Sequence, residues 1–233
     1  MIIGVTGASS GVGSAVCLKL VEVGHTVRTF GRRPSGQDEY NFRLGQPIDT
    51  RGFNDLDALI HLAWDWVADP ELSHATNVGG SVALAEVCRR FAVTPVLLST
   101  VSVSARQFSM YGNQKAIVED AFEAAGGGSV RSGLIWSPIA APFGMIQTVL
   151  KLARVPGVCV HLKPDPLMTY SDLDHLTDAL VARATGMADQ PIAIGASTEP
   201  VRLSEISHAA RPNRPMSHRA LSPKRLLGIA SNA

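Results

Sequence analysis

The chain has 233 residues and a formal net charge of +1, with 45% hydrophobic and 18% charged residues. This size and composition are typical of a soluble globular protein with one substantial core, and the basic residues form no stripe that would bind nucleic acid. The cysteines, Cys17, Cys88 and Cys159, are odd in number and far apart, which argues against a disulfide framework or a zinc site. We expect a reducing compartment, no metal and no nucleic-acid partner.

No apolar stretch approaches the length that a membrane-spanning helix needs. Residues 1–6 have the apolar character of a buried strand, which leaves no room for a charged leader and an apolar signal core. We therefore expect a cytoplasmic protein without a membrane partner.

Strand-like and helix-like stretches alternate along the chain. The pattern predicts strands at residues 1–6, 25–30, near Phe42, and at 56–63, 96–100, 130–136 and 191–194. It predicts helices at residues 14–23, 72–91, 109–125 and 173–185. This alternation indicates an α/β fold with a Rossmann-like, doubly wound parallel sheet. Because the pattern weakens after Pro138, we expect a dinucleotide-binding core over residues 1–137. A small substrate-binding annex with returning core elements would cover residues 138–233.

A glycine-rich segment, residues 4–13 (GVTGASSGVG), joins the first predicted strand to the first predicted helix. This context favours a dinucleotide-binding loop: Gly7 permits the tight turn, Gly11 lets the backbone approach the pyrophosphate, and Gly13 lets helix and strand pack closely. The alternative is a tight turn that binds no ligand. A triphosphatase-type phosphate loop is excluded because Ser14 stands where that motif requires a lysine.

The residues after the second predicted strand indicate which nicotinamide cofactor binds. The acidic residue that would accept hydrogen bonds from the ribose of NAD is missing, and Arg32 and Arg33 stand there instead. A guanidinium group suits a 2′-phosphate because it is permanently charged and donates parallel hydrogen bonds. We therefore predict NADP, with NAD possible. The alternative is a solvated basic turn.

Tyr111 and Lys115 lie one turn apart on a predicted helix and so share a face. A phenol has a reference pKa of about 10, and a neighbouring ammonium group together with the positive oxidised nicotinamide favours its ionised form. The pair therefore predicts acid/base chemistry with a lowered pKa for Tyr111. The alternative is a half-buried aromatic residue beside a solvated lysine.

The order of these motifs resembles the short-chain dehydrogenase/reductase superfamily, in particular its extended branch, the NAD-dependent epimerases and dehydratases. The motifs are TGxxxGxG at 6–13, IHLA at 60–63, NVxG at 77–80, LST at 98–100, YxxxK at 111–115 and RSG at 131–133. The glycine spacing is that of the shorter, single-domain branch. The resemblance implies an NAD(P)-dependent oxidoreductase. Its predicted cofactor-binding residues are Gly7, Ser9, Ser10, Gly11, Val12, Gly13, Arg32, Arg33, Leu62, Ala63 and Lys115.

The resemblance also implies roles for the catalytic candidates. Tyr111 matches the acid/base, Lys115 its electrostatic partner and the holder of the nicotinamide ribose, and Thr100 the residue that orients the substrate oxygen. Ser99 or Ser102 could take the role of Thr100. Asn77 matches a member of a proton relay, whereas His61 has the character of a structural residue. The helices around Asn77 and Tyr111 resemble the pairing faces of family dimers, so we expect a homodimer.

Departures from the family pattern bear on the substrate. Val101 and Ser102 replace the Asp-Glu pair of the dehydratases, which argues against dehydration of a nucleotide sugar. Leu134 replaces an asparagine that holds sugar-nucleotide phosphates in epimerases, which argues against a diphosphate substrate. The residues predicted to wall the substrate pocket are aromatic, which suits a small, weakly polar carbonyl compound: Trp64, Trp66, Trp136 and Phe143. The alternative is that these side chains cover the seam between core and annex. Asp65 and Gln107 are the polar candidates for specificity.

These observations predict an NADP(H)-dependent oxidoreductase that transfers hydride between the nicotinamide and a small, largely apolar carbonyl compound or secondary alcohol. Two other functions remain open. One is a nucleotide-sugar epimerase-like enzyme with tightly held NAD. The other is a non-catalytic protein that binds NADPH as a sensor, since a fold alone does not establish turnover.

Overall fold

The structure is a computed structural model that describes residues 1–136, 167–188, 192–194 and 200–202. Phe143, Cys159 and most of the predicted annex lie outside the described residues. The boundary between residues 137 and 138 therefore stays a prediction. Cys17 and Cys88 are free thiols, and burial raises the pKa of Cys88 to about 12, which makes that thiol inert.

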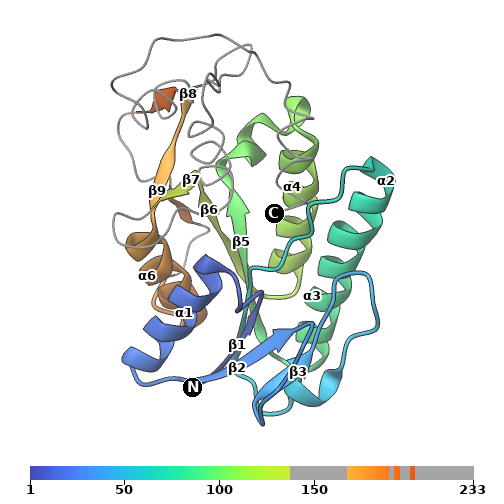
Figure 1. The fold of residues 1–233 in the computed structure, drawn as a ribbon, viewed down its shortest axis with the longest axis vertical. Helices are drawn as coiled ribbons and strands as arrows, with labels where there is room; N and C mark the ends of the chain where they lie inside the picture. The colour runs from blue at the N-terminus through green and yellow to red at the C-terminus, as the bar shows by residue number, and fades with distance from the viewer. Residues whose placement is uncertain (137–166, 189–191, 195–199, 203–233) are drawn as a thin grey trace, which may run out of the picture.

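A parallel sheet of seven strands forms the centre of the molecule, in the order β10-β6-β5-β4-β1-β2-β3 (Figure 1). The strands are β1 (Ile2–Thr6), β2 (Thr26–Gly31), β3 (Glu39–Asn41), β4 (Ala58–His61), β5 (Thr94–Thr100), β6 (Gly128–Ser132) and β10 (Ile192–Ile194). The strand order reverses between β1 and β4, which is the point where doubly wound folds bind ligands, outside the carboxyl ends of the strands. The predicted Rossmann-like fold is confirmed.

Helices cover both faces of the sheet, and each face has its own hydrophobic core (Figure 1). On one face, α1 (Gly11–Glu22) and α6 (Leu173–Ala184) bury Val16, Leu20, Leu176 and Leu180 against β1, β4 and β5. On the other face, α3 (Gly80–Arg90) and α4 (Met110–Ala124) bury Leu84, Cys88, Val118 and Phe122. The sheet is thus fully enclosed, which explains why its strands are almost continuously apolar.

Two elements differ from the sequence-based expectation. The predicted helix at 72–91 consists of α2 (Pro70–Ser73), a π-helical segment η2 (His74–Gly79) and α3. The predicted strand at 130–136 divides at Gly133 into β6 and β7 (Leu134–Trp136), which pairs with β9 (Tyr170–Asp172). At Gly133 a Cβ atom would lie 2.3 Å from the carbonyl oxygen of Thr169, so glycine permits the close approach of these strands.

The remaining described elements are short. They are the 3₁₀ helices η1 (Thr50–Phe53) and η3 (Val101–Phe108), and β8 (Leu167–Met168), which pairs antiparallel with β11 (Val201–Arg202). Within the described part of the chain, no helix has both the length and the apolar character needed to cross a membrane. The same residues contain no cluster of His, Cys, Asp and Glu side chains able to hold a metal ion.

Candidate active site

The glycine-rich loop connects β1 to α1 and lies at the carboxyl edge of the sheet. Gly7 has φ +70°, which side chains disfavour, and the carbonyl oxygen of Gly7 would lie 2.2 Å from a Cβ atom at Gly13. Ser10 caps α1, because its hydroxyl oxygen accepts a hydrogen bond from the amide of Gly13 at 3.0 Å. The loop therefore presents bare backbone and the first amides of a helix, an arrangement that fits an anionic pyrophosphate.

Thr6 fastens the glycine loop to the segment after β4. Its hydroxyl oxygen accepts hydrogen bonds from the amides of Leu62 and Ala63, and it lies 2.7 Å from Nδ1 of His61. Because the hydroxyl oxygen already accepts from two amides, its lone pairs are used and its one proton is left to donate to Nδ1 of His61. Nε2 then carries the ring proton and donates it to Ser81 at 3.0 Å. Burial, together with the charge of Lys115, lowers the pKa of His61 to about 3, so the ring is neutral and structural.

Tyr111 lies in the first turn of α4, between the indole rings of Trp64 and Trp66. The centroid of its ring is 5.4 Å from that of Trp64, edge to face, and 5.3 Å from that of Trp66. Both tryptophans come from the segment after β4, so this segment and the start of α4 form one aromatic cluster. The structure thus brings three sequence-predicted residues into direct contact.

Lys115 is buried beneath this cluster. Its Nζ donates a hydrogen bond to the carbonyl oxygen of Leu98 on β5 at 2.8 Å and lies 4.1 Å from the ring centroid of Trp64. A cation over an indole face is attracted by the ring quadrupole. Burial nevertheless lowers the pKa of Lys115 to about 7, with Glu119 partly opposing that effect. The side chain therefore titrates near neutral pH.

The pKa of the Tyr111 phenol is raised by burial, which is opposite to the direction predicted from the sequence. The physical reason is desolvation of the phenol by burial, while the ammonium of Lys115 lies 5.9 Å from the tyrosine ring centroid. The predicted lowering rested on a close ammonium group and a bound, positively charged nicotinamide, and it took no account of desolvation. The phenol is therefore protonated at neutral pH and able to donate a proton.

Thr100 is the last residue of β5, as predicted, and is nearly buried. Its hydroxyl donates to Ser102 at 3.3 Å and accepts a hydrogen bond from the Ser102 amide at 3.2 Å. A Cβ atom at Gly112 would lie 2.3 Å from the Ser102 carbonyl oxygen, so glycine beside Tyr111 lets α4 pack against this segment. Ser99, the other alternative for the role of Thr100, is buried, and its hydroxyl has no hydrogen-bond partner among the described atoms.

Asn77 is buried in the π-helical segment and binds the backbone of Asp65 at both ends of its amide. Its Oδ1 accepts from the Asp65 amide, and its Nδ2 donates to the Asp65 carbonyl oxygen, both at 2.8 Å. Nδ2 also lies 3.3 Å from the hydroxyl of Ser73, which donates to Gln114 on α4. Asn77 thereby fixes the residue that stands between the two tryptophans. The relay role predicted for Asn77 stays a prediction.

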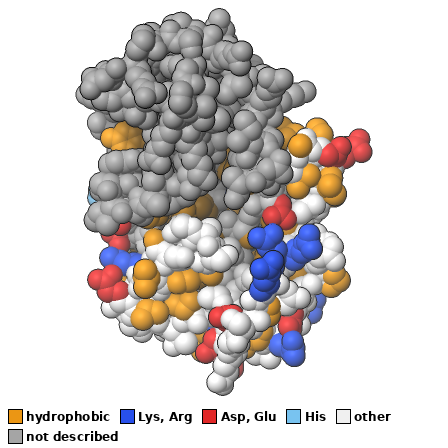
Figure 2. Space-filling model, viewed as in Figure 1, with side chains coloured by type: hydrophobic (Ala, Val, Ile, Leu, Met, Phe, Trp, Pro, Cys, Tyr) orange, Lys and Arg blue, Asp and Glu red, His pale blue; other side chains and the backbone are white. Residues whose placement is uncertain are grey.

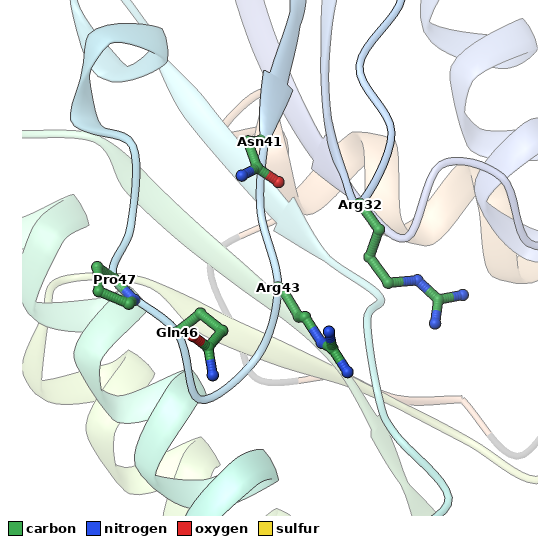
Figure 3. A pocket seen from close by; sticks show the side chains of 5 residues that line it. All are labelled: Arg32, Asn41, Arg43, Gln46 and Pro47. Carbon is green, nitrogen blue, oxygen red and sulfur yellow. The ribbon is translucent and has the colours of Figure 1, made fainter.

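Arg32 and Arg33 follow β2 and are exposed, and Arg32 lines a pocket of about 350 Å³ at the ends of β2 and β3 (Figure 3). The other lining residues are Asn41, Arg43, Gln46 and Pro47. Figure 2 shows Lys and Arg side chains gathered on the viewed face, near where β2 ends in Figure 1. Arg33 does not line the pocket.

Three predictions concern side chains outside the described part of the structure, namely those of Trp136, Phe143 and Gln107. The sequence interpretation did not predict four residues that hold the site together by hydrogen bonds or close packing, or that line the pocket: Thr6, Ser73, Gly112 and Arg43. Thr6 and Gly112 stand inside the motifs that carried the prediction, so their positions offered a signal. Arg43 and Ser73 gave none, because an isolated arginine or serine is an ordinary surface residue.

The fold has counterparts among known proteins. Residues 3–126 match the model of the NAD dependent epimerase/dehydratase family, which is more than half of the chain. The chain belongs to this family. Comparison with curated protein sequences finds no match.

Several solved structures share the fold, with matches that cover 95% or more of this chain. MoeE5 in complex with UDP-glucose and NAD has a TM-score of 0.77 and 20% identity, covering 95% of this chain and 85% of the other. A UDP-galactose 4-epimerase has a TM-score of 0.74 and 22% identity, covering 95% and 86%. The UDP-N-acetylglucosamine 4-epimerase from Bacillus cereus has a TM-score of 0.71 and 17% identity, covering 98% and 92%. At these identities, the likeness establishes the fold.

Proposed function

We propose that this protein is an enzyme that transfers hydride between a nicotinamide dinucleotide and a carbon that bears a hydroxyl group. The observation that supports it best is the position of Tyr111, whose phenol is protonated, shielded from water and adjacent to a buried lysine. These groups lie at the carboxyl edge of the sheet, where doubly wound folds bind their ligands and where the glycine loop also lies.

The residues around the glycine loop fit the dinucleotide. Side chains at Gly7 and Gly13 would fill the cradle, and the N-terminus of α1 is suited to the pyrophosphate. When bound, the nicotinamide supplies or accepts the hydride. Tyr111 donates its proton to the carbonyl oxygen during reduction, and the phenolate that this leaves removes a proton from the hydroxyl during oxidation. Thr100 and Ser102 orient that oxygen, and Lys115 adds positive charge below the phenol.

We propose epimerisation as the reaction type. The family assignment and the similarity of the fold to several nucleotide-sugar epimerases support this alternative better than they support a reductase of free carbonyl compounds. In an epimerase the same groups act twice, because one carbon is oxidised and then reduced from its other face. The substrate class proposed here is a sugar linked to a nucleoside diphosphate.

Reduction of a small apolar carbonyl compound is the second candidate. The observation that favours it is the aromatic cluster, because the rings of Trp64 and Trp66 are packed directly on Tyr111 and offer few polar anchors for a sugar. A sensor without turnover is the third candidate. The presence of both Tyr111 and Lys115 counts against it.

One assay separates these candidates. One portion of the purified protein is denatured to release and identify any bound nucleotide, and the native remainder is tested with UDP-glucose, UDP-galactose and a panel of aromatic ketones. Interconversion of UDP-sugars, seen by NMR without net change in absorbance at 340 nm, supports the epimerase. Net oxidation of NADPH or NADH by a ketone supports the reductase. Binding of nucleotide without either reaction supports the sensor, and failure to bind any nucleotide overturns all three.

We also propose that NADP(H) is preferred over NAD(H) and that two copies associate through α3 and α4. The first proposal is supported by Arg32, which has no acidic partner among the described residues, and by the absence of an acidic residue directly after β2. The second is supported by Val82 and Ile117, which keep 38% of their surface exposed on these adjacent helices. Light scattering of the Ile117→Glu variant is expected to show monomers, whereas Leu18→Glu on α1 leaves the association state unchanged.

A further inference from the structure

The pocket at the ends of β2 and β3 has two arginines, and only one of them was predicted from the motif after β2. Arg32 follows the last residue of β2, Gly31, which is paired in register with Asn41, the last residue of β3. Arg43 lies two residues after that strand end. Figure 3 shows that the side chains of Arg32 and Arg43 extend in the same direction, and both line the pocket.

The backbone holds Arg43 in this position. Its neighbours Phe42 and Leu44 are buried in the core, 4% and 6% exposed, so the alternation along the chain turns Arg43 outward. The Phe42 amide donates to the carbonyl oxygen of Gly31 at 2.8 Å, which ties this segment to the end of β2. The Arg43 carbonyl oxygen also accepts a hydrogen bond from the Gln46 amide. Arg43 is therefore positioned by core packing rather than by contacts of its own.

Neither guanidinium group is neutralised. Among the described residues, no carboxylate forms an ion pair or hydrogen bond with Arg32 or Arg43. Other exposed arginines of this chain do have acidic partners, such as Arg51 with Asp49 and Arg89 with Glu86. Two like charges around one pocket repel each other, and a dianion between them relieves that repulsion. The lining therefore suits a phosphate group better than a neutral ribose hydroxyl.

The pocket lies where the adenosine end of a dinucleotide is expected. β2 is the neighbour of β1 in the sheet, and the glycine loop follows β1, so a nucleotide with its pyrophosphate at α1 places its adenosine ribose over the end of β2. We propose that Arg43, together with Arg32, binds a phosphate monoester on that ribose and that Arg43 is the residue that determines preference for the 2′-phosphorylated cofactor. This inference rests on the nicotinamide-dependent function proposed above.

Matched single substitutions test it: Arg43→Gln and Arg32→Gln, with Arg90→Gln as the control. All three remove one exposed guanidinium group, but Arg90 lies at the end of α3 and does not line the pocket. We expect Arg43→Gln to weaken NADPH binding about tenfold or more, the size of effect for one charge-assisted hydrogen bond. Its affinity for NADH should stay within about twofold of the parent, as should both affinities of Arg90→Gln.

Calorimetric titrations with two nucleotide fragments measure the contribution of the 2′-phosphate to binding. Adenosine 2′,5′-bisphosphate is expected to bind the parent more tightly than adenosine 5′-monophosphate and to lose that advantage in Arg43→Gln. Unchanged thermal stability of each variant excludes misfolding, since these side chains are exposed. Arg43→Lys should recover part of the lost affinity, because lysine keeps the charge but not the planar fork.

The outcomes separate this inference from the proposed function. Equal losses in Arg43→Gln and Arg90→Gln, or a parent protein that binds NADH and not NADPH, overturn the role of Arg43 and leave a nicotinamide-dependent enzyme intact. If Arg32→Gln loses the preference for NADPH and Arg43→Gln keeps it, the role of Arg43 is likewise overturned and the nicotinamide-dependent enzyme is not. A parent protein that binds neither nucleotide overturns both proposals.

Discussion

The two ends of the candidate site differ in how far their basic side chains are exposed to water. At the ends of β2 and β3, Arg32 and Arg43 are exposed and have no acidic partner among the described residues. Under the start of α4, Lys115 and His61 are buried, and their polar atoms bind a carbonyl oxygen and hydroxyl groups of the protein. Exposed charges select a ligand by electrostatic complementarity, whereas burial sets the protonation states that the chemistry uses.

The largest effect is expected for the group at the centre of the buried end. Tyr111→Phe removes the hydroxyl that we propose exchanges the proton and keeps the ring that contacts Trp64 and Trp66. We expect the turnover rate, in whichever reaction the substrate panel reveals, to fall by about 10²- to 10⁴-fold. Nucleotide binding is expected to be unchanged, as measured by calorimetry. Turnover close to that of the parent would assign the proton transfer to another residue.

Lys115 makes stability depend on pH in a defined direction. Its pKa is about 7 in the folded protein, against an ordinary value of 10.5. Between these values the unfolded chain holds a proton that the folded protein lacks, so the free energy of unfolding rises with pH, by up to about 1.4 kcal/mol per pH unit. Below pH 7 both states hold the proton and this dependence ends.

The measurement is urea unfolding of the parent and of Lys115→Met from pH 6.5 to 9.5. The difference between the two proteins isolates Lys115, because Cys17 and Cys88, whose pKa values burial raises, titrate alike in both. We expect the difference to change with pH in favour of the parent as pH rises. Parallel stability curves would mean that Lys115 keeps an ordinary pKa.

Asn77 connects the buried end to the backbone that carries the tryptophans. Asn77→Ala leaves the Asp65 amide and carbonyl group without their partner, which is expected to cost about 1–3 kcal/mol in the free energy of unfolding. Release of Asp65 should also change the tryptophan fluorescence of the folded protein. Asn77→Asp can accept from the Asp65 amide but loses the amide donor, so an intermediate effect is expected. A destabilised variant with unchanged fluorescence would argue against a positioning role.

The smallest effect is expected for Trp66, which lies between the Tyr111 ring and the solvent. Trp66 is 50% exposed and covers one side of the Tyr111 ring. Trp66→Ala admits water to the phenol, which should lower the pKa of Tyr111 and shift the alkaline limb of the pH–rate profile to lower pH. Thermal stability should change little because the indole is half exposed. A shift to higher pH would show that Trp66 does not shield the phenol.

Much of the fold was predictable because periodicity and turn residues act locally. The strand that ends at Thr100 and the helix that follows Ser109 were predicted within a residue or two of their observed bounds. The helix at 72–91 was predicted as one regular element, and its π-helical segment was missed. That segment places Asn77 against Asp65, a contact between distant residues that no local pattern reports.

The sequence by itself determined the Rossmann-like fold, the glycine loop and the pairing of Tyr111 with Lys115, because each depends on spacing within one or two neighbouring elements. Only the tertiary structure decided the protonation states and the partners. Burial raised the pKa of Tyr111, whereas the sequence predicted a lowered one. The end of β3 brought Arg43, rather than Arg33, to the pocket of Arg32. Desolvation and the meeting of separate strand ends are properties of the packed sheet, and both arise from contacts that are distant in the sequence.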